Sequence, residues 1–196
     1  MTTPSTSLRE RSKAKRRRAI QVAALRLFAE RGYDGATIAD IAEAAEVAPR
    51  TISMYFPTKL DIATSFSGDI ADRLTQTFRD HPGLNTAEIM DRWLRTEVAS
   101  MDPELTAAMT LMFETNPGLR AVSSTHIAEA ADVGGAALRA ETGLTAADPM
   151  LDVVGAAVGA AIVEYLTTAL RSTTTPGHHD SFIRYLQAII TAATTL

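Results

Sequence analysis

The chain has 196 residues, 46% of them hydrophobic, which is enough apolar material for a sizeable core in one domain or two small ones. It contains no cysteine, which excludes disulfides, thiolate metal sites and cysteine catalysis. The net charge of −4 conceals an asymmetry, because residues 1–60 hold 11 basic and 6 acidic side chains and residues 61–196 hold 8 and 17. A basic N-terminal third followed by an acidic remainder is typical of a DNA-binding segment on a body that does not bind DNA.

The N-terminus is polar and then strongly basic. Residues 1–14 are predicted to be a disordered arm, and the stretch from Arg9 to Arg18 holds seven cations and one acid. We expect Arg16, Arg17 and Arg18 to contact DNA phosphates or the minor groove, although a charge run can also be merely solvated. No apolar signal-peptide core follows, so export is not expected and the protein is predicted to be cytoplasmic.

The next segments predict three helices. The first is expected at about 16–30 and ends at Gly32, a natural C-cap. Thr37 is a good N-cap for a second, short helix whose apolar residues recur at helical spacing. Pro49 suits the first position of a third helix, at about 48–56, because proline has no backbone N–H to lose there. Two short helices that meet at such a turn predict a helix-turn-helix, whose second helix enters the DNA major groove.

The motif resembles the DNA-binding signature of TetR/AcrR-type transcriptional regulators. The matching residues are Thr37, Ile38, Ile41, Ala42, Ala45, Val47, Thr51, Ile52, Tyr55, Phe56 and Lys59. The segment 23–33 is similar to the first helix of that family. The resemblance implies an all-α fold with an N-terminal three-helix DNA-binding domain at 15–56 and a C-terminal dimerisation and ligand-sensing domain at 57–196.

Three residues depart from the family pattern. Glu46 stands where the family usually has glycine, and a left-handed conformation there would cost roughly 1–2 kcal/mol. Ala48 replaces the usual serine, so the second helix of the motif loses a side-chain cap worth roughly 0.5–2 kcal/mol. Ser53 replaces an aromatic residue that in the family commonly lies against the DNA backbone.

The predicted DNA contacts lie on and around the second helix of the motif: Arg50, Thr51, Ser53, Met54, Tyr55, Lys59 and Thr37. Arg50 is the candidate for a guanine edge, with Thr51 and Met54 also facing the groove. Tyr55, Lys59 and Thr37 are expected to meet phosphates. Lys59 resembles a family lysine in that role, and helix N-termini favour phosphate.

Turns containing proline or glycine separate the later helices, expected at about 58–80, 86–101, 103–115, 119–141, 149–171 and 179–193. No period-2 strand pattern is present, and the resemblance implies about nine helices in all. The most apolar stretch, Val153 to Leu166, contains Glu164 and is too short to span a bilayer, so no membrane partner is expected.

In the family the last two helices form a four-helix interface across a dimer. The helix at 149–171 is rich in small residues and the last helix carries apolar residues at helical spacing, although both could equally pack within one subunit. The resemblance implies a homodimer whose interface contains Gly155, Gly159, Ile162, Phe182, Leu186 and Ile189.

The middle helices are rich in methionine and aromatic residues, which make adaptable apolar pockets. The predicted ligand-binding residues are Phe66, Met90, Trp93, Glu97, Met112, Phe113, His126 and Tyr165, and core packing is the alternative for each of them. The pair His178-His179 lacks further ligands at metal spacing, so no metal is expected, and no cofactor either. Without a Gly-rich phosphate loop, nucleophile elbow or HExxH motif, an enzyme is not expected.

The sequence predicts a ligand-responsive transcriptional repressor that binds a palindromic operator as a dimer. Its expected partners are double-stranded DNA, a second copy of the chain and a small-molecule effector. One alternative is a constitutive DNA-binding or architectural protein, or an activator, whose C-terminal domain only dimerises. Another is a ligand-binding helical bundle or enzyme with a vestigial head.

Overall fold

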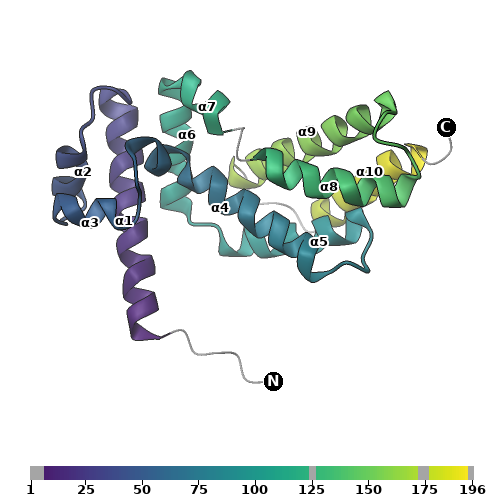
Figure 1. Cartoon of the computed structure of the whole chain (residues 1–196), viewed down its shortest axis with the longest axis horizontal. Coiled ribbons are helices and arrows are strands. Elements are labelled where there is room, and N and C mark those ends of the chain that lie inside the picture. The colour runs from purple at the N-terminus through teal and green to yellow at the C-terminus, as the bar shows by residue number, and fades with distance from the viewer. Residues whose placement is uncertain (1–6, 124–126, 172–176, 194–196) are drawn as a thin grey trace. The chain divides into compact units, whose positions relative to one another are not determined.

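The computed structural model describes residues 7–123, 127–171 and 177–193. Every regular element in these ranges is an α-helix (Figure 1), which confirms the predicted all-α class. The helices are α1 (Leu8–Arg31), α2 (Ile38–Ala44), α3 (Pro49–Ser53), α4 (Lys59–Asp80), α5 (Thr86–Ser100), α6 (Pro103–Thr115), α7 (Pro117–Ser123), α8 (Ile127–Thr142), α9 (Pro149–Arg171) and α10 (His178–Ala193).

The described ranges contain ten helices, one more than the nine that the resemblance implies. The segment expected as one helix over 119–141 contains two, since α7 ends at Ser123 and α8 begins at Ile127. Predicted ligand residue His126 lies outside the described residues.

The helices form two compact units. Among the described residues the head unit comprises 7–68 and 102–123, and the body unit comprises 69–101, 127–171 and 177–193. This division differs from the predicted boundary at residue 57, because α6 and α7 belong to the head. Leu105, Ala108 and Met112 of α6 share a hydrophobic cluster with α1, and burial of that apolar surface assigns α6 to the head unit.

Helix α1 begins eight residues earlier than expected, which corrects the predicted arm over residues 8–14. Ser7 caps it: the Ser7 hydroxyl accepts a hydrogen bond from the Glu10 N–H at 3.2 Å, and the Glu10 carboxylate accepts the Ser7 N–H at 2.9 Å. This reciprocal capping box satisfies two backbone donors that a helix start otherwise leaves unpaired. The basic residues of this stretch therefore lie on a helix, and residues 1–6 lie outside the described residues.

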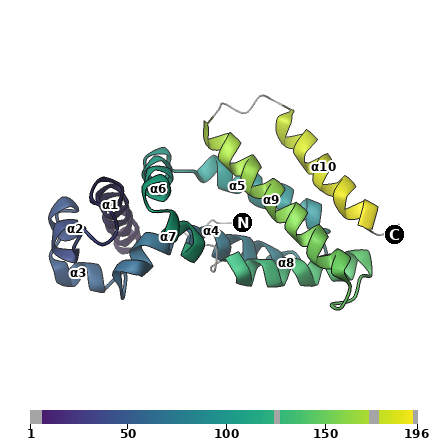
Figure 2. The same cartoon turned by 90° about the horizontal axis from the view of Figure 1, so that it is seen from above.

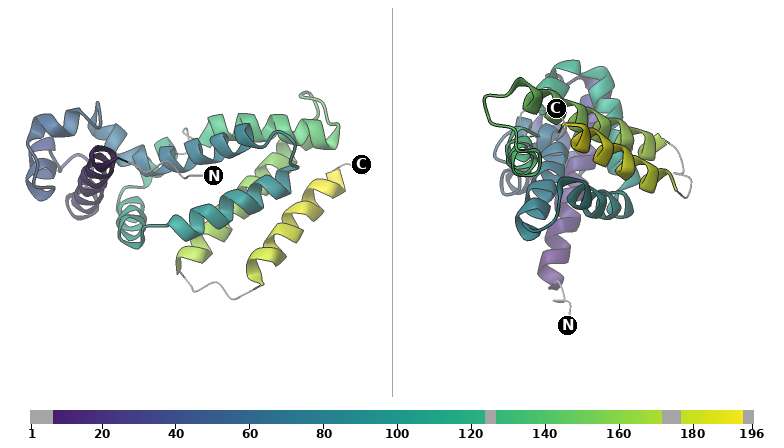
Figure 3. Two further views of the ribbon diagram at one scale, coloured as in Figure 1. Left: turned by 90° about the horizontal axis from the view of Figure 1, so that it is seen from below. Right: turned by 90° about the vertical axis from the view of Figure 1, so that its right-hand side faces the viewer.

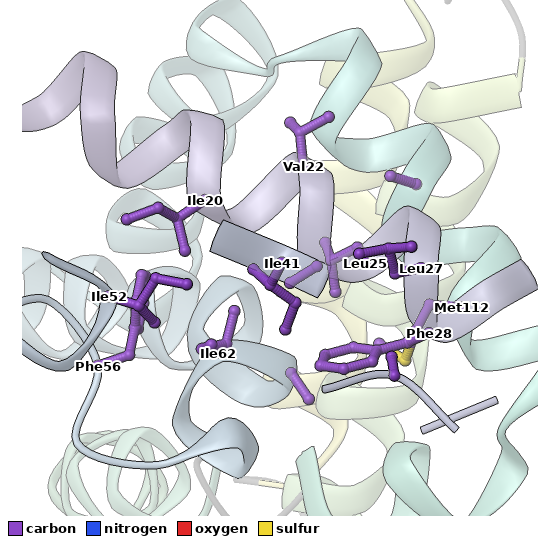
Figure 4. Close-up of a cluster of buried hydrophobic side chains, with 14 of the residues drawn as sticks. Ile20, Val22, Leu25, Leu27, Phe28, Ile41, Ile52, Phe56, Ile62 and Met112 are labelled. Atoms are coloured by element: carbon purple, nitrogen blue, oxygen red, sulfur yellow. The ribbon is translucent and has the colours of Figure 1, made fainter. Parts of the chain in front are cut away.

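The core of the head unit holds the helix-turn-helix in place. Ile20, Leu25 and Phe28 of α1 are at most 1% exposed and pack in one cluster with Ile41 of α2 and Ile52 of α3 (Figure 4). Burying each such side chain stabilises the unit by roughly 1.5–3 kcal/mol. Because Ile52 is buried, the opposite side of the short helix α3 faces outwards.

The body unit has its own core. Trp93 and Leu94 of α5 pack with Leu186 and Ile190 of α10 and with Val158 of α9. Helix α10 lies beside α9 and α5, and α8 packs against α9 (Figures 2 and 3). These contacts leave a long side of α9 uncovered within the chain.

Helix α9 is strongly apolar, although most of its surface is exposed within the chain. Its 18 residues from Pro149 to Leu166 have a mean hydropathy of 1.5, so by length and composition alone they could cross a membrane. This differs from the expectation that the most apolar stretch is too short. Core helices of water-soluble proteins pass the same test when they are buried, yet only 17% of this window is buried within the chain.

Candidate functional sites

The helix-turn-helix begins with a capping box at the N-terminus of α2. The Thr37 hydroxyl accepts the Asp40 N–H at 3.1 Å, and the Asp40 carboxylate accepts the Thr37 N–H at 2.8 Å. Hydrogen bonds from Thr37, with help from Arg31, hold the pKa of the Asp40 carboxyl below its ordinary value. Thr37, a predicted phosphate contact, is exposed and therefore lies at the surface. Its hydroxyl forms part of the capping box.

Glu46, which stands where the family usually has glycine, adopts the left-handed backbone conformation. Its φ is +54°, the single positive φ of a non-glycine residue among the described ranges. The Val47 N–H that follows donates to the Ala42 carbonyl at 2.9 Å, which closes the C-terminus of α2. A side chain in this conformation costs roughly 1–2 kcal/mol, so the turn is maintained against local strain.

Helix α3 presents a small polar and apolar surface. It is shorter than predicted, spanning Pro49–Ser53, and Ala48 makes no side-chain cap, as expected from the sequence. Arg50 and Ser53 are exposed and Met54 is 80% exposed. The predicted contacts Thr51 and Tyr55 are half-buried.

Lys59 has a different place from the one predicted. Its ammonium group donates to the carbonyl oxygens of Tyr33 at 2.8 Å and Ala36 at 3.1 Å, and it lies 4.3 Å from the centre of the Tyr33 ring. Two of its three donors therefore join the α1–α2 connection to the start of α4. Lys59 therefore stabilises the motif by pairing two backbone carbonyls. The sequence alone did not reveal these acceptors.

Arg18 corrects a second prediction. Its guanidinium pairs with both carboxylate oxygens of Asp102, Nη2 to Oδ1 at 2.9 Å, and donates to Glu104 Oε2 at 2.6 Å. Arg26 donates to the other oxygen of Glu104 at 2.9 Å. Because this guanidinium is held against two carboxylates of α6, it joins the helices of the head unit and does not act as an open phosphate contact.

The other two predicted basic contacts also lie on α1. Arg16 is exposed and Arg17 is half-buried, and the Arg17 guanidinium lies 5.0 Å from the centre of the Phe56 ring. Phe56 is itself 3% exposed and directly follows the α3 turn. The Arg17 guanidinium therefore lies close to the segment expected to meet DNA.

The predicted ligand residues are not gathered into one pocket. Met112 is buried in the head cluster with Phe66 and Phe113 packed against it, whereas Met90, Trp93 and Tyr165 belong to the body cluster. Their methionine and aromatic composition is therefore largely that of two ordinary cores. The sequence could not separate these alternatives, because both require apolar residues at helical spacing.

Glu97 also has a structural role. It is 5% exposed and forms a two-point ion pair with Arg73, with distances of 2.9 and 2.6 Å. Hydrogen bonds to the Glu97 carboxylate raise the pKa of Arg73 above its ordinary value, so the guanidinium stays charged. A buried carboxylate matched in this way is satisfied within the chain.

Sequence reasoning missed a polar chain across three helices of the body unit. His179 Nε2 lies 2.7 Å from Asp91 Oδ1, and His179 Nδ1 lies 2.9 Å from the Tyr165 hydroxyl. The Tyr165 ring in turn stacks on Phe182 with centroids 4.3 Å apart. Asp91 is 88 positions from His179, so no local pattern could have joined them.

No group of three or more potential metal ligands occurs among the described residues.

The predicted dimer residues divide into exposed and buried members. A Cβ built on Gly155 or Gly159 of α9 would meet nothing within 4 Å, so this side of the helix is open. Ile162, Phe182 and Ile189 are half-buried, but Leu186 is fully buried in the body core, which corrects its assignment to an interface. Helical spacing identified the apolar residues of α10 without showing which of them point inwards.

The uncovered surface continues beyond the predicted residues. Val153 and Val163 of α9 are each 56% exposed, and Tyr185 of α10 is 57% exposed. The name α9–α10 surface is used below for these exposed residues and the two glycines: Val153, Gly155, Gly159, Val163 and Tyr185. The sequence prediction for α9 named Gly155, Gly159 and Ile162 and did not include the two valines.

Comparison with known proteins identifies the N-terminal motif. The family described as bacterial regulatory proteins, tetR family, matches residues 20–65. The HTH-type transcriptional repressor KstR of Rhodococcus jostii (strain RHA1) is 33% identical over 108 residues, which cover 54% of this chain and 51% of KstR. The HTH-type transcriptional regulator TcmR of Streptomyces glaucescens is 32% identical over 135 residues, 61% of this chain and 60% of TcmR. The chain thus spans about half to three fifths of the length of these curated relatives.

The fold has relatives among solved structures. The transcriptional regulator FadR of Bacillus subtilis, solved in complex with stearoyl-CoA, matches with a TM-score of 0.58 and 18% identity over 90% of this chain and 97% of FadR. At this identity the likeness concerns the fold alone. The matched residues 20–65 contain the capped α2, the strained turn at Glu46 and the outward-facing α3. Residues 20–65 therefore carry the N-terminal motif of the tetR family of bacterial regulatory proteins.

Proposed function

We propose that this protein is a DNA-binding transcriptional regulator, a repressor that binds a palindromic operator as a homodimer and responds to a small-molecule effector. The observation that carries the proposal is the outer side of α3. Ile52 fixes the helix to the head core, while Arg50, Ser53 and Met54 are exposed. A helix held in this way can enter the major groove of DNA.

The chemistry of these side chains suits DNA. Arg50 can donate two hydrogen bonds to the O6 and N7 atoms of guanine, the commonest specific contact in the major groove. Met54 offers an apolar surface for a thymine methyl group. Thr51 lies on the same short helix. Such contacts would give the protein its sequence preference.

A second group of residues would bind the DNA backbone. Arg16 and Arg17 on α1, Thr37 at the start of α2 and Tyr55 after α3 supply cations and hydroxyls, which position a protein on phosphates without reading sequence. Each cation that neutralises a phosphate adds affinity that falls as salt rises. Lys59 supports this surface through the carbonyls that it holds.

The α9–α10 surface supports a homodimer. A palindrome needs two heads separated by about one turn of DNA, roughly 34–36 Å, so a second copy of the chain is required. The open glycines allow two helices to approach closely, and Val153, Val163 and Tyr185 would be buried by a partner. The Val163→Glu variant should sediment as a monomer while the wild type sediments as a dimer. Wild-type protein that partitions into lipid vesicles would favour a membrane partner for α9 instead.

Regulation would follow from a shift in population. An effector that binds the body better in a conformation unsuited to DNA lowers DNA affinity by its differential binding, and a coupling of about 1–3 kcal/mol gives several-fold induction. No catalytic role is proposed for the chain, and we place its action in the cytoplasm, where DNA is available. The body need bind only a ligand, not transform it.

The test is a footprint of the purified protein on the DNA upstream of its own gene. A protected palindrome whose protection requires the intact α3 surface is expected. A chain that protects no specific DNA at any concentration would contradict the proposal. Protection that is unaffected by every compound bound to the body would leave a constitutive DNA-binding protein, the alternative considered from sequence.

A further inference from the structure

The body unit contains a cavity that no sequence prediction included. It has a volume of about 460 Å³ and lies where the α4–α5 connection meets the C-terminal half of α8. Phe78, Leu84, Ile89 and Val133 give it apolar walls, and Thr86 and Glu141 also line it. Small-molecule sites in proteins have this size and this mixture of apolar walls with a few polar groups. None of the ligand residues predicted from sequence lies in its wall.

Thr86 is the first sign that the cavity is built for a ligand. The residue is 2% exposed, and its hydroxyl oxygen has no hydrogen-bond partner within the described part of the chain. Buried hydroxyls are nearly always paired, because an unpaired one loses its interaction with water and gains nothing. The backbone N–H of the same residue is satisfied, since it donates to Glu141 Oε2 at 2.9 Å. A hydroxyl left open beside a fixed carboxylate suits a ligand that donates hydrogen bonds.

The charge of the cavity points the same way. Glu141 is an acid in its wall, and no lysine or arginine lines it. Arg139, the nearest cation along α8, folds back towards Gly135, where its Nη1 would lie 3.7 Å from an added Cβ. His81 also lines the cavity, and its Nδ1 lies 3.0 Å from the Thr77 carbonyl oxygen. That contact uses Nδ1 as the donor, which in the neutral ring leaves Nε2 as an acceptor.

We propose that this cavity binds a small organic cation, an ammonium group attached to an aromatic or aliphatic body. The ammonium would pair with the Glu141 carboxylate and donate to the Thr86 hydroxyl. The apolar body would lie against Phe78, Ile89 and Val133, and an aromatic wall adds cation–π attraction. That this ligand acts as the effector rests on the proposed function. That the cavity binds it does not.

Titration calorimetry of the full chain with phenethylammonium tests the site. Neutral 2-phenylethanol and anionic 3-phenylpropanoate have the same body and serve as charge controls. We expect saturable binding of the ammonium, at least tenfold tighter than of either control compound. Equal or tighter binding of the anion would overturn the proposal, as would absence of saturable binding for both phenethylammonium and the larger benzyltriethylammonium.

Two variants locate the contact. Glu141→Gln keeps an oxygen for the Thr86 N–H and removes the charge, so it should weaken ammonium binding about tenfold or more. Thr86→Val should weaken binding several-fold and raise the melting temperature of the free protein, because it removes an unpaired buried hydroxyl. A purely structural role for Thr86 would not shift these two measurements in opposite directions. Asp132→Asn removes one negative charge from the exposed part of α8 and should leave binding unchanged.

The same preparations separate this inference from the proposed function. Wild-type protein that protects operator DNA but binds no ammonium would overturn the cation site and leave the regulator intact. Charge-dependent ammonium binding by a chain that protects no DNA would support the site and contradict the proposed function. Ammonium binding that weakens operator affinity would support both.

Discussion

The side-chain oxygen of Asn116 accepts the backbone N–H of Tyr33 at 2.8 Å, and its amide group donates to the Phe28 carbonyl at 2.9 Å. One residue at the C-terminus of α6 thereby satisfies both a donor and an acceptor at the end of α1. Asn116→Ala leaves these buried groups unpaired and should destabilise the protein by about 1–3 kcal/mol in urea denaturation. Glu114→Ala, at an exposed position of α6, should change stability by less than about 0.5 kcal/mol; equal effects of the two substitutions would contradict this role.

Glu46 offers a substitution that should stabilise the turn. With φ at +54°, Glu46→Gly removes roughly 1–2 kcal/mol of steric cost and adds roughly 0.5–1 kcal/mol of lost chain entropy. We expect a net gain of about 0.5–1 kcal/mol in the free energy of unfolding, measured in urea. Glu43→Gly, inside α2, should instead lose about 1 kcal/mol. A loss at both positions would show that the left-handed turn does not strain Glu46.

Lys59 should contribute to stability in the absence of DNA. Lys59→Met keeps much of the apolar stem and removes the donors to the Tyr33 and Ala36 carbonyls, so the free protein should lose about 1–3 kcal/mol. A lysine that served only a phosphate would leave the stability of the free protein unchanged. DNA affinity should fall similarly for every sequence, because no base contact is lost. Fluorescence-monitored unfolding and a binding titration on the same preparation measure the two effects.

Arg50 should govern discrimination among DNA sequences. Arg50→Ala should lose about 1–3 kcal/mol of preference between two operators that differ at one guanine, and competition binding at fixed salt measures that difference. Arg92→Ala removes the same charge from an exposed position on α5 and should keep the preference. If discrimination survived in Arg50→Ala, the guanine contact would have to be assigned to another residue.

Acid should weaken the contact between α1 and α6. Hydrogen bonds from Arg18 hold the pKa of the Asp102 carboxyl below its ordinary value. A group with a lowered folded-state pKa stabilises the fold above its unfolded-state pKa, about 3.9, and that stability is lost as the pH falls through the folded-state value. Asp102→Asn should cost about 0.5–1 kcal/mol at pH 7, as for a partly exposed pair.

The same variant should show a smaller drop in urea midpoint than the wild type between pH 7 and pH 3. Asp72→Asn, on the exposed side of α4, should retain the full drop. A wild-type midpoint that did not change over this range would contradict the proposed contribution of the Arg18–Asp102 pair.

The parts of this protein that follow from sequence are those whose causes are local. Thr37 and Asp40 are three residues apart and Pro49 begins α3, so caps and periodicity predicted the helix-turn-helix. The capping box of Ser7 and Glu10 was equally local, and it was missed because polar composition was read as disorder. The roles of Arg18 and Lys59 depend on acceptors 84–86 and 23–26 positions away, and no short-range pattern reveals such partners.

Periodicity has a second limit. It shows that a residue of α10 is apolar but not whether that residue meets its own chain or another molecule, which is why Leu186 and Ile189 were grouped together. Met112 and Trp93 were likewise assigned to one pocket although they belong to separate clusters. The cavity beside Thr86 gave no signal at all, since an unpaired hydroxyl becomes visible only when its neighbours are known.

The largely uncovered length of α9 has a consequence for gene control. If its apolar side is shielded only when two chains meet, the species competent for a palindrome grows with the square of chain concentration while monomers predominate. Occupancy of the operator would then rise steeply over a narrow range of expression. A cell could therefore set the threshold of this switch by the copy number of the protein as well as by the level of its ligand.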